Sequence, residues 1–362
     1  MTNNVLMLSN VCFIGVGQAG GNIANQFSKL GYTTFYINTS QTDLDTIDVP
    51  KQYKYCPPAA SGTSKNRGLA KGYFKKYENI IIEIVKARLG SFRHIFVCAS
   101  AGGGTGSGML PMMLESLSEN IKDITFGAIV SLPDLKESYK IKHNAQECID
   151  ELKDIETIGN TYIIDNNACF MGNVRSPLEN IDSLFANSLN DFLSVSHASK
   201  KGVIDEKEIL TMLAINGYSV IANINSNAKD KKDKVVISAI MPKPNSVALR
   251  LAYNLNDDRD YIQDEVEALL GKASLSLSTY SDMPPFVVAF GLDFPMEKMN
   301  QISESANSDR IIMEDSALDK IVNTTQVVVE EYIDPVLRVR KDKDISSKLK
   351  KKISDMVDIN NL

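Results

Sequence analysis

The strongest constraint on this chain is a dense run of glycines directly after a buried strand. Residues 100–108 read Ser-Ala-Gly-Gly-Gly-Thr-Gly-Ser-Gly, with five glycines in the seven positions 102–108. The apolar segment 94–99 before them predicts a strand, and the segment 109–119 after them predicts a helix. An ordered glycine has an entropic cost, so packing alone does not explain so many. Glycine loops that open a helix let backbone N–H groups approach phosphate oxygens. This second glycine loop is therefore predicted to bind phosphate.

A first glycine loop lies near the N-terminus. Residues 15–22 read Gly-Val-Gly-Gln-Ala-Gly-Gly-Asn, after an apolar strand at 11–14 and before a helix at 22–30. The pattern G-x-G-x-x-G by itself favours a dinucleotide site, so a Rossmann-type NAD-dependent oxidoreductase is one alternative. That site needs an acid at the end of the next strand, 32–37. The chain has Asn38, Thr39 and Ser40 there, and its first acid is Asp43.

Neither glycine loop contains the lysine of the G-x-x-x-x-G-K-[ST] motif, which disfavours a P-loop NTPase. Two loops on neighbouring strands can hold a polyphosphate from both sides without that lysine. We therefore expect a nucleoside di- or triphosphate with Mg²⁺.

Strands and helices alternate through the first half, which predicts a parallel sheet covered by helices on both faces. A helix is expected at 68–89, strands at 125–130 and 161–164, and Pro111 in the first turn of the helix 109–119. A capping box at Ser176 begins a long helix. Beyond it we expect strands at 235–241 and 286–290, a helix at 258–270, and mostly helix over 311–357, interrupted at Pro335.

The composition of the chain disfavours further classes of function. The net charge of −6 disfavours a protein that coats DNA. The segment Arg338–Lys352, however, has eight basic and two acidic residues, so it carries +6 and the remainder −12. Five cysteines without a C-x-x-C pair and three histidines without ligand spacing predict neither disulfides nor a metal site. No apolar run of about 18 residues and no secretion signal is found, so we expect a cytoplasmic protein without membrane contact.

The second glycine loop is very similar to the signature of the tubulin/FtsZ superfamily of filament-forming GTPases. Gly17–Asn22 resembles the first phosphate loop of that family, and further matches follow in the family's order over about residues 11–210. The length and the basic tail most resemble the TubZ-type homologues of plasmids and phages, which segregate DNA.

The resemblance implies a fold and a set of nucleotide ligands. The fold would be α/β: a Rossmann-like, parallel-sheet GTP-binding domain at 1–175, a central helix at 176–198, an α+β activation domain at 199–310, and a C-terminal helix with the basic tail at 311–362. The third loop, residues 60–67, would approach the γ-phosphate. Four residues before Asn190, where the family has an aromatic side chain, stands Ala186. The implied GTP-binding residues are Gly17, Gln18, Ala19, Gly21, Asn22, Asn38, Gly102, Gly103, Gly104, Thr105, Gly106, Glu137 (ribose), Asn166 and Asn190 (guanine).

Catalysis is assigned by the same resemblance to Asp205 and Glu208. As a lone motif, two acids at a helix start only complement the helix dipole. In the family, acids at this spacing complete the active site of the next subunit, where they orient the attacking water. The resemblance thus implies GTP/GDP and Mg²⁺ as cofactors, a head-to-tail filament, and hydrolysis that depends on assembly.

Partners and alternatives follow from that reading. The filament subunit itself is the first partner. A DNA-binding adaptor protein docking on Arg338–Lys352 is the second, without direct sequence-specific DNA binding. Besides the oxidoreductase, the alternatives are an FtsZ-like cell-division filament and a nucleotide-binding structural protein without turnover.

Overall fold

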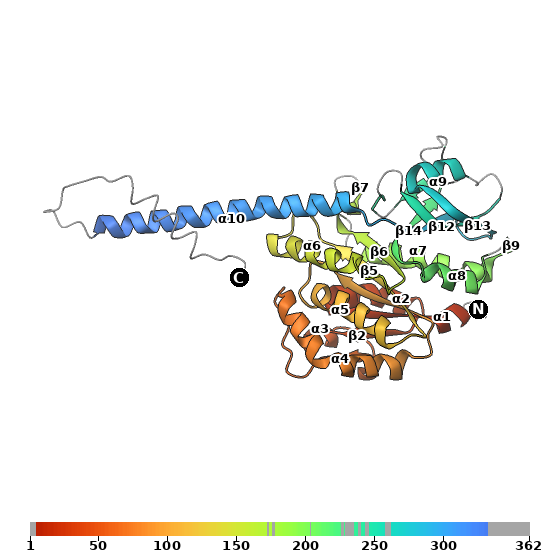
Figure 1. The fold of residues 1–362 in the computed structure, drawn as a ribbon, viewed down its shortest axis with the longest axis horizontal. Helices are drawn as coiled ribbons and strands as arrows, with labels where there is room; N and C mark the ends of the chain where they lie inside the picture. Colours follow the sequence, from red (N-terminus) through yellow and green to blue (C-terminus); the bar gives the residue numbers. More distant parts are fainter. Residues whose placement is uncertain are drawn as a thin grey trace. The chain divides into compact units, whose positions relative to one another are not determined.

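The computed structural model describes residues 5–171, 174–175, 178–202, 204–225, 228, 235–237, 240–242, 246–257 and 262–331. The helices are α1 Val5–Asn10, α2 Gly17–Lys29, α3 Gln41–Asp45, α4 Arg67–Leu89, α5 Thr105–Asn120, α6 Tyr139–Lys153, α7 Leu178–Ala198, α8 Glu206–Leu213, α9 Gln263–Leu270 and α10 Met296–Glu331, with 3-10 turns η1 Lys51–Tyr53 and η2 Asn166–Cys169 (Figure 1). The strands are β1 Val11–Val16, β2 Thr34–Ile37, β3 Lys54–Tyr55, β4 His94–Ser100, β5 Thr125–Leu132, β6 Asn160–Asp165, β7 Phe170–Met171, β8 Val174–Arg175, β9 Lys201–Gly202, β10 Gly217–Ile224, β11 Val235–Ile237, β12 Val247–Leu255, β13 Lys272–Tyr280 and β14 Phe286–Leu292.

The first half forms the expected parallel sheet. Strands follow in the order β3-β2-β1-β4-β5-β6, and all of these pairs are parallel. Strands β1, β4, β5 and β6 are buried along almost their whole length, because helices cover both faces. All their carboxyl ends therefore meet at one edge, where such sheets bind ligands.

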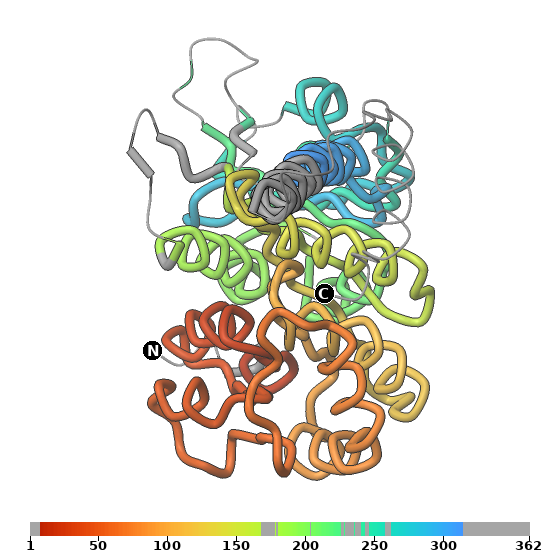
Figure 2. The backbone as a smooth tube through the Cα atoms, turned by 90° about the vertical axis from the view of Figure 1, so that its left-hand side faces the viewer, coloured from red at the N-terminus to blue at the C-terminus, as the bar shows by residue number. Residues whose placement is uncertain are grey.

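Two apolar layers hold helices against this sheet. One layer packs α4, α5 and α6 on one face through buried residues such as Val85, Met113 and Ile149. The other packs α2, α7 and α8 on the opposite face, with Phe27, Leu189 and Met212 among its members. Figure 2 shows the red segment with α2 and the orange segment with α4 on different sides of the N-terminal strands. The doubly covered sheet fixes where each strand ends, and so places the loops that follow.

Helix α5 begins earlier than its proline predicts. The helix starts at Thr105, so Pro111 lies inside it rather than in its first turn, and that expectation was wrong. A proline inside a helix leaves the carbonyl four residues earlier without its partner. Here that carbonyl belongs to Ser107, and it accepts a hydrogen bond from the Arg67 guanidinium at 3.1 Å. Arg67 is 5% exposed and also pairs with Glu147 and Glu151 of α6 at 2.7 and 2.9 Å.

The sheet continues into the second half with mixed direction. Strand β10 is parallel to β6 but antiparallel to β14, and β12 pairs antiparallel with β14 and parallel with β13. Strands β10, β12 and β13 were not expected, whereas β14 falls where predicted. Helix α7 contacts both halves: it packs on α2, and Phe192 lies 5.4 Å from the Phe290 ring of β14, centroid to centroid.

By its internal contacts the chain divides into two units, residues 1–309 and 310–362. Helix α10 starts at Met296, earlier than the helical segment expected from residue 311. The proline and serine of the capping box, Pro335 and the basic segment lie outside the described residues. Within the part that is described, no helix has both the length and the apolar character needed to cross a membrane.

Candidate nucleotide-binding site

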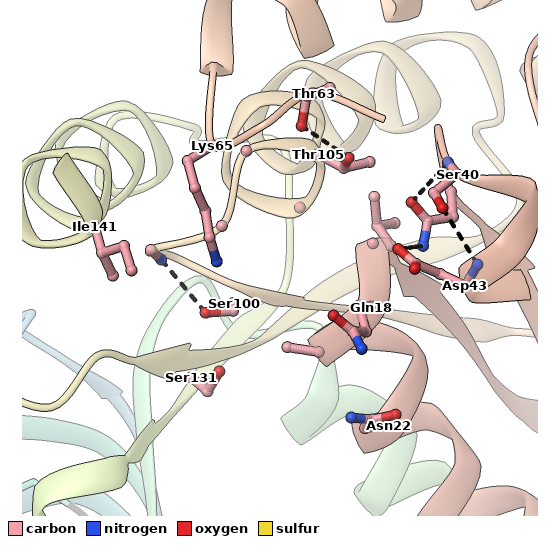
Figure 3. A pocket seen from close by; sticks show the side chains of 18 of the residues that line it. Gln18, Asn22, Ser40, Asp43, Thr63, Lys65, Ser100, Thr105, Ser131 and Ile141 are labelled. Carbon is pink, nitrogen blue, oxygen red and sulfur yellow. Dashed lines mark hydrogen bonds between the residues drawn. The ribbon is translucent and has the colours of Figure 1, made fainter. Parts of the chain in front are cut away.

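A cavity of about 450 Å³ opens at the carboxyl ends of the parallel strands (Figure 3). Residues that follow β1, β2, β4, β5 and β6 all reach it, so it lies at the edge that the topology predicts for a ligand. Its lining comprises Val16, Gly17, Gln18, Ala19, Asn22, Asn38, Thr39, Ser40, Asp43, Gly62, Thr63, Ser64, Lys65, Ser100, Gly102, Gly103, Gly104, Thr105, Gly106, Ser131, Pro133, Glu137, Ile141, Asn166, Leu178 and Asp182.

The two glycine loops meet on the floor of the cavity. Gly17 opens α2 with φ at +71°, a conformation that favours glycine. A Cβ on Gly17 would stand 3.0 Å from the backbone nitrogen of Gly106, so the loops are in contact. Both lead directly into helices of more than eight residues, α2 and α5, whose N-terminal N–H groups favour an anion. The floor is thus built for phosphate groups.

Three threonine hydroxyls join the loops at one end. The Oγ1 atom of Thr105 lies 2.6 Å from that of Thr39 and 3.2 Å from that of Thr63. All three residues are buried, and they come from the second glycine loop, the end of β2 and the third loop. Nearby, the Asn38 side-chain amide donates to the Asp43 carboxylate at 3.2 Å. Asn38 was expected at the site from the sequence, whereas Asp43 was not.

Amide and carboxylate groups also line the cavity. They belong to Asn22 of α2, Asn166 after β6 and Asp182 of α7, and Leu178 lines it with them. Burial, with the neighbouring Asp182 carboxylate, raises the pKa of the Cys98 thiol at the end of β4. Asp182 itself is 8% exposed. Such groups match the hydrogen-bonding edge of a purine base.

Asn190 does not line the cavity, contrary to the sequence prediction. Its Oδ1 accepts a hydrogen bond from the Tyr32 hydroxyl at 3.1 Å, beside α2. Asp182 stands eight positions earlier, about two turns along α7, and faces the cavity instead. In the sequence, Leu178 and Asp182 have the same four-residue spacing as Ala186 and Asn190, but the aliphatic side chain at 178 gave no signal of a site.

The segment after β5 forms the remaining wall. Pro133, the predicted ribose ligand Glu137, and Ile141 line the cavity. This wall is fixed from behind, because Asn167 donates to the Pro133 carbonyl at 3.0 Å and accepts from the Leu135 N–H at 2.8 Å.

Most of the residues that were predicted to bind GTP line this one cavity. Of the predicted GTP-binding residues, only Gly21 and Asn190 are missing from the lining. A Cβ on Gly21 would stand 3.1 Å from the Ile47 side chain, so that glycine permits close packing behind the loop. The third loop, expected to approach the γ-phosphate, contributes Gly62, Thr63, Ser64 and Lys65 to the lining.

The predicted catalytic acids lie away from the cavity. Asp205 caps α8, where its Oδ1 accepts the Glu208 N–H at 2.8 Å. The Glu208 carboxylate pairs with Arg250 of β12 at 3.0 Å. Asp205 instead lines a separate cavity of about 500 Å³ around β9, together with Ser196, His197, Ser199, Lys200, Lys201, Gly202, Ile204 and Glu206. Neither acid reaches the nucleotide cavity of its own chain.

Together, the fold and the cavity define an α/β nucleotide-binding protein. Residues 10–171 match the Tubulin/FtsZ family, GTPase domain. The chain is similar to the tubulin-like protein TubZ of Clostridium botulinum C phage, with 26% identity over 94% of this chain and 98% of the relative.

Solved structures agree on the fold. TubZ of Clostridium botulinum phage c-st, truncated at its C-terminal tail, superposes with a TM-score of 0.74 at 24% identity, over 84% of this chain and 99% of that one. A GTPγS-form protofilament of Bacillus thuringiensis serovar israelensis TubZ gives a TM-score of 0.72 at 13% identity, over 86% and 94%. These comparisons do not favour a NAD-dependent oxidoreductase.

Proposed function

We propose that this protein binds GTP in the cavity, assembles head-to-tail, and hydrolyses the nucleotide where two subunits meet. The main observation behind this proposal is that the cavity and the two acids at the start of α8 lie apart in the chain; we call these the two half-sites. The nucleotide cavity lies at the ends of the parallel strands, whereas Asp205 and Glu208 begin α8 and are absent from its lining. A second copy that brings α8 to the cavity would complete the site. The similarity to a TubZ that forms a protofilament supports this arrangement.

Within the cavity, the glycine loops would hold the phosphates through backbone N–H groups. Asn22, Asn166 and Asp182 would read the guanine, with Leu178 against its face. Asp182 replaces Asn190 in this assignment, because it lines the cavity and Asn190 does not. Glu137 would contact the ribose.

Mg²⁺ fits the chemistry of the phosphate end. This ion takes oxygen ligands, keeps several waters, and is commonly held by one or two carboxylates together with substrate phosphates. The Asp43 carboxylate and the hydroxyls of Thr39, Thr63 and Thr105 supply such oxygens. Within the described ranges no three His, Cys, Asp or Glu side chains gather into a metal site. The phosphates would therefore provide much of the coordination, and the ion would neutralise their charge.

In the neighbouring subunit, the two acids would orient and polarise the attacking water. Asp205 is exposed, so its carboxylate is accessible to a partner. The ion pair with Arg250 restricts the Glu208 carboxylate to one side of α8. Catalysis would rest mainly on positioning and electrostatics, as in other phosphoryl transfers.

The test measures GTP hydrolysis against protein concentration in wild type and in Asp205→Ser. Serine caps a helix about as well as aspartate, so the substitution keeps the α8 cap and removes the carboxylate. We expect hydrolysis per subunit to rise with assembly in wild type and to fall at least about tenfold in the variant, since general acid–base groups contribute about 10²–10⁴-fold. Sedimentation checks that the variant still assembles.

A mixing experiment tests whether the half-sites come from different subunits. Asp205→Ser supplies an intact cavity, and Asp182→Ala supplies intact α8 acids. If the site forms between subunits, the mixture hydrolyses GTP faster than the sum of the separate variants. Concentration-independent turnover, or normal hydrolysis by Asp205→Ser, would refute the proposal. Filaments without any turnover would support the structural-protein alternative.

We further propose a role in segregating plasmid or phage DNA, in the prokaryotic cytosol. Support comes from the similarity to a phage TubZ along nearly the whole chain and from the +6 charge of Arg338–Lys352. A DNA-bound adaptor protein would dock on this segment. Truncation after Leu337 should leave GTP binding intact and abolish capture of filaments by the adaptor–DNA complex. Unchanged capture would refute the docking role.

A further inference from the structure

The segment between β5 and α6 carries the predicted ribose ligand, Glu137, on a stretch without regular structure. Residues 133–138 form neither helix nor strand, yet Pro133, Glu137 and Ile141 all line the nucleotide cavity. Figure 3 shows the Ile141 side chain at the cavity, where α6 begins. Glu137 itself is exposed. The direction of its carboxylate therefore depends on the contacts that fix the backbone of this segment.

Leu135 is the residue at which this segment is held from two sides. Its N–H donates to Oδ1 of Asn167 at 2.8 Å, and its carbonyl accepts a hydrogen bond from the Lys142 ammonium at 3.1 Å. Lys142 belongs to α6, is buried, and does not line the cavity. Leu135 stands two residues before Glu137, so these two hydrogen bonds limit where the backbone of Glu137 can lie.

Helix α10 holds the Lys142 ammonium in place. The ammonium pairs with the Asp309 carboxylate at 2.6 Å and donates to the Ser305 hydroxyl at 2.7 Å. A charged ammonium is costly to bury, and apolar side chains often stabilise a fold as well as a buried ion pair does. Stability alone therefore does not require a lysine at this position, whereas a fixed hydrogen bond to the Leu135 carbonyl does.

The second contact of Leu135 also leads to α10. Lys298 of α10 pairs with Oδ2 of Asp165 at 2.8 Å. The Oδ1 atom of the same carboxylate accepts the backbone N–H and the side-chain amide of Asn167, at 2.9 and 2.7 Å. The first turns of α10 are packed into the core through Met299, Ile302 and Ala306. Both contacts that hold Leu135 are thus anchored on one packed helix.

We propose that Lys142 is a positioning residue for the ribose: held by α10, its ammonium fixes Leu135 so that the Glu137 carboxylate faces the ribose hydroxyls of the nucleotide. This inference rests on the proposed GTP binding and adds the residue that sets one of its contacts. A carboxylate already held in place loses little conformational entropy when it accepts the two hydroxyls. Without the lysine the carboxylate would sample other directions, and the hydroxyls would contribute less to affinity.

The test compares the affinity for GTP with the affinity for 2′,3′-dideoxy-GTP, which lacks both hydroxyls. Dissociation constants are measured below the assembly concentration for wild type, Lys142→Met, Glu137→Ala and the double variant. Methionine fills the buried space without the charge. Lys140→Met is the matched control, because Lys140 is an exposed lysine of the same helix that does not line the cavity.

Wild type should bind GTP about tenfold or more tightly than the dideoxy nucleotide, as for hydrogen bonds to a charged group. In Lys142→Met this ratio should fall below about threefold, while the affinity for the dideoxy nucleotide changes little. The double variant should show the same ratio as Glu137→Ala, because both substitutions act on one contact. Lys140→Met should keep the wild-type ratio. If Lys142→Met does not fold, Asp309→Ala weakens the same anchor from α10 and should lower the ratio in the same direction.

Three results would overturn the inference. The first is a wild-type ratio in folded Lys142→Met or, where that variant does not fold, in Asp309→Ala. The second is an equal loss of affinity for both nucleotides, which would indicate a general disturbance of the cavity. The third is a double variant with a lower ratio than Glu137→Ala, which would place the effect of Lys142 on another contact.

The outcome for wild type separates this inference from the proposed function. In each of the three cases, wild-type GTP binding would still support that function. A wild type that binds both nucleotides equally would remove the ribose contact of Glu137 and this inference with it, although GTP binding itself would stand. A wild type that binds no GTP would refute the proposed function.

Discussion

The substitution Gly103→Ala tests whether glycine is required at this position by the fold or by a bound nucleotide. A Cβ at this position would meet only the Ser100 carbonyl oxygen, at 3.8 Å, and otherwise open space. Gly103 is not among the residues with positive φ, so an alanine fits the backbone. Nothing within the described chain therefore requires glycine here, yet Gly103 lines the cavity. We infer that the position is glycine because a bound nucleotide approaches its backbone.

Two opposite effects are expected from this one methyl group. Without nucleotide, the variant should be as stable as wild type or more stable by about 0.4–1 kcal/mol, because alanine restricts the unfolded chain. A methyl group forced into a tight contact costs about 1–3 kcal/mol. The dissociation constants of GTP and GDP should therefore each rise about tenfold, and any rise that corresponds to this free-energy range agrees with the prediction. Urea unfolding without ligand gives the stability, and titration calorimetry gives the two affinities.

Gly72→Ala is the matched control. A Cβ at Gly72 meets nothing within 4 Å, but the residue lies inside α4 and does not line the cavity. This variant should gain about 0.5–1 kcal/mol of stability and bind nucleotide normally. If folded Gly103→Ala binds GTP as tightly as wild type, the second glycine loop does not hold the nucleotide in the way we infer.

Three further predictions concern Asp182, a buried histidine and a half-buried ion pair. Asp182→Ala should weaken GTP binding at least about tenfold and Asn190→Ala by much less, since only Asp182 lines the cavity; equal effects in direct titrations would contradict this assignment. Burial lowers the pKa of His94 to about 3. At pH values below the ordinary pKa of histidine, the unfolded chain therefore takes up a proton that the folded chain does not. Wild type should therefore lose about 2 kcal/mol more stability than His94→Phe between pH 7 and pH 5, measured by urea unfolding, and identical pH profiles would refute this origin. Asp309→Ala removes a 36% exposed carboxylate that pairs at 2.6 Å with a lysine of α6 that is only 2% exposed, so it should destabilise by about 2 kcal/mol, against less than about 1 kcal/mol for the exposed Asp150→Ala; similar unfolding midpoints would contradict it.

The first half of the fold was largely readable from the sequence. Fully buried parallel strands are continuous apolar runs, and β4 and β6 were located within a residue or two for that reason. The second half gave a weaker signal, because β13 is half-exposed and alternates serine and alanine with larger residues. Its strand character depends on pairing with β12 and β9, which lie far away in the sequence.

Two differences between the sequence-based expectations and the structure have the same physical origin. Pro111 looks like a helix start when only its neighbours are considered. The guanidinium of Arg67, which takes over the carbonyl freed by the proline, comes from α4. Asn190 looks like a base ligand by its place on the central helix, but the rotation of α7 turns it toward Tyr32. Both outcomes depend on contacts between elements that are distant along the chain.

The sequence by itself determined the two glycine loops, the strands before them and the helices after them, because glycine spacing and hydrophobic periodicity act over a few neighbouring residues. Only the tertiary structure decided which side chains share the cavity. It brought Lys65 and Asp182 into the lining of one cavity, and it kept Asp205 and Glu208 out of that lining. A cavity is formed by loops that the sheet gathers from separate segments, so its membership follows from strand order and helix rotation, which short-range patterns do not encode.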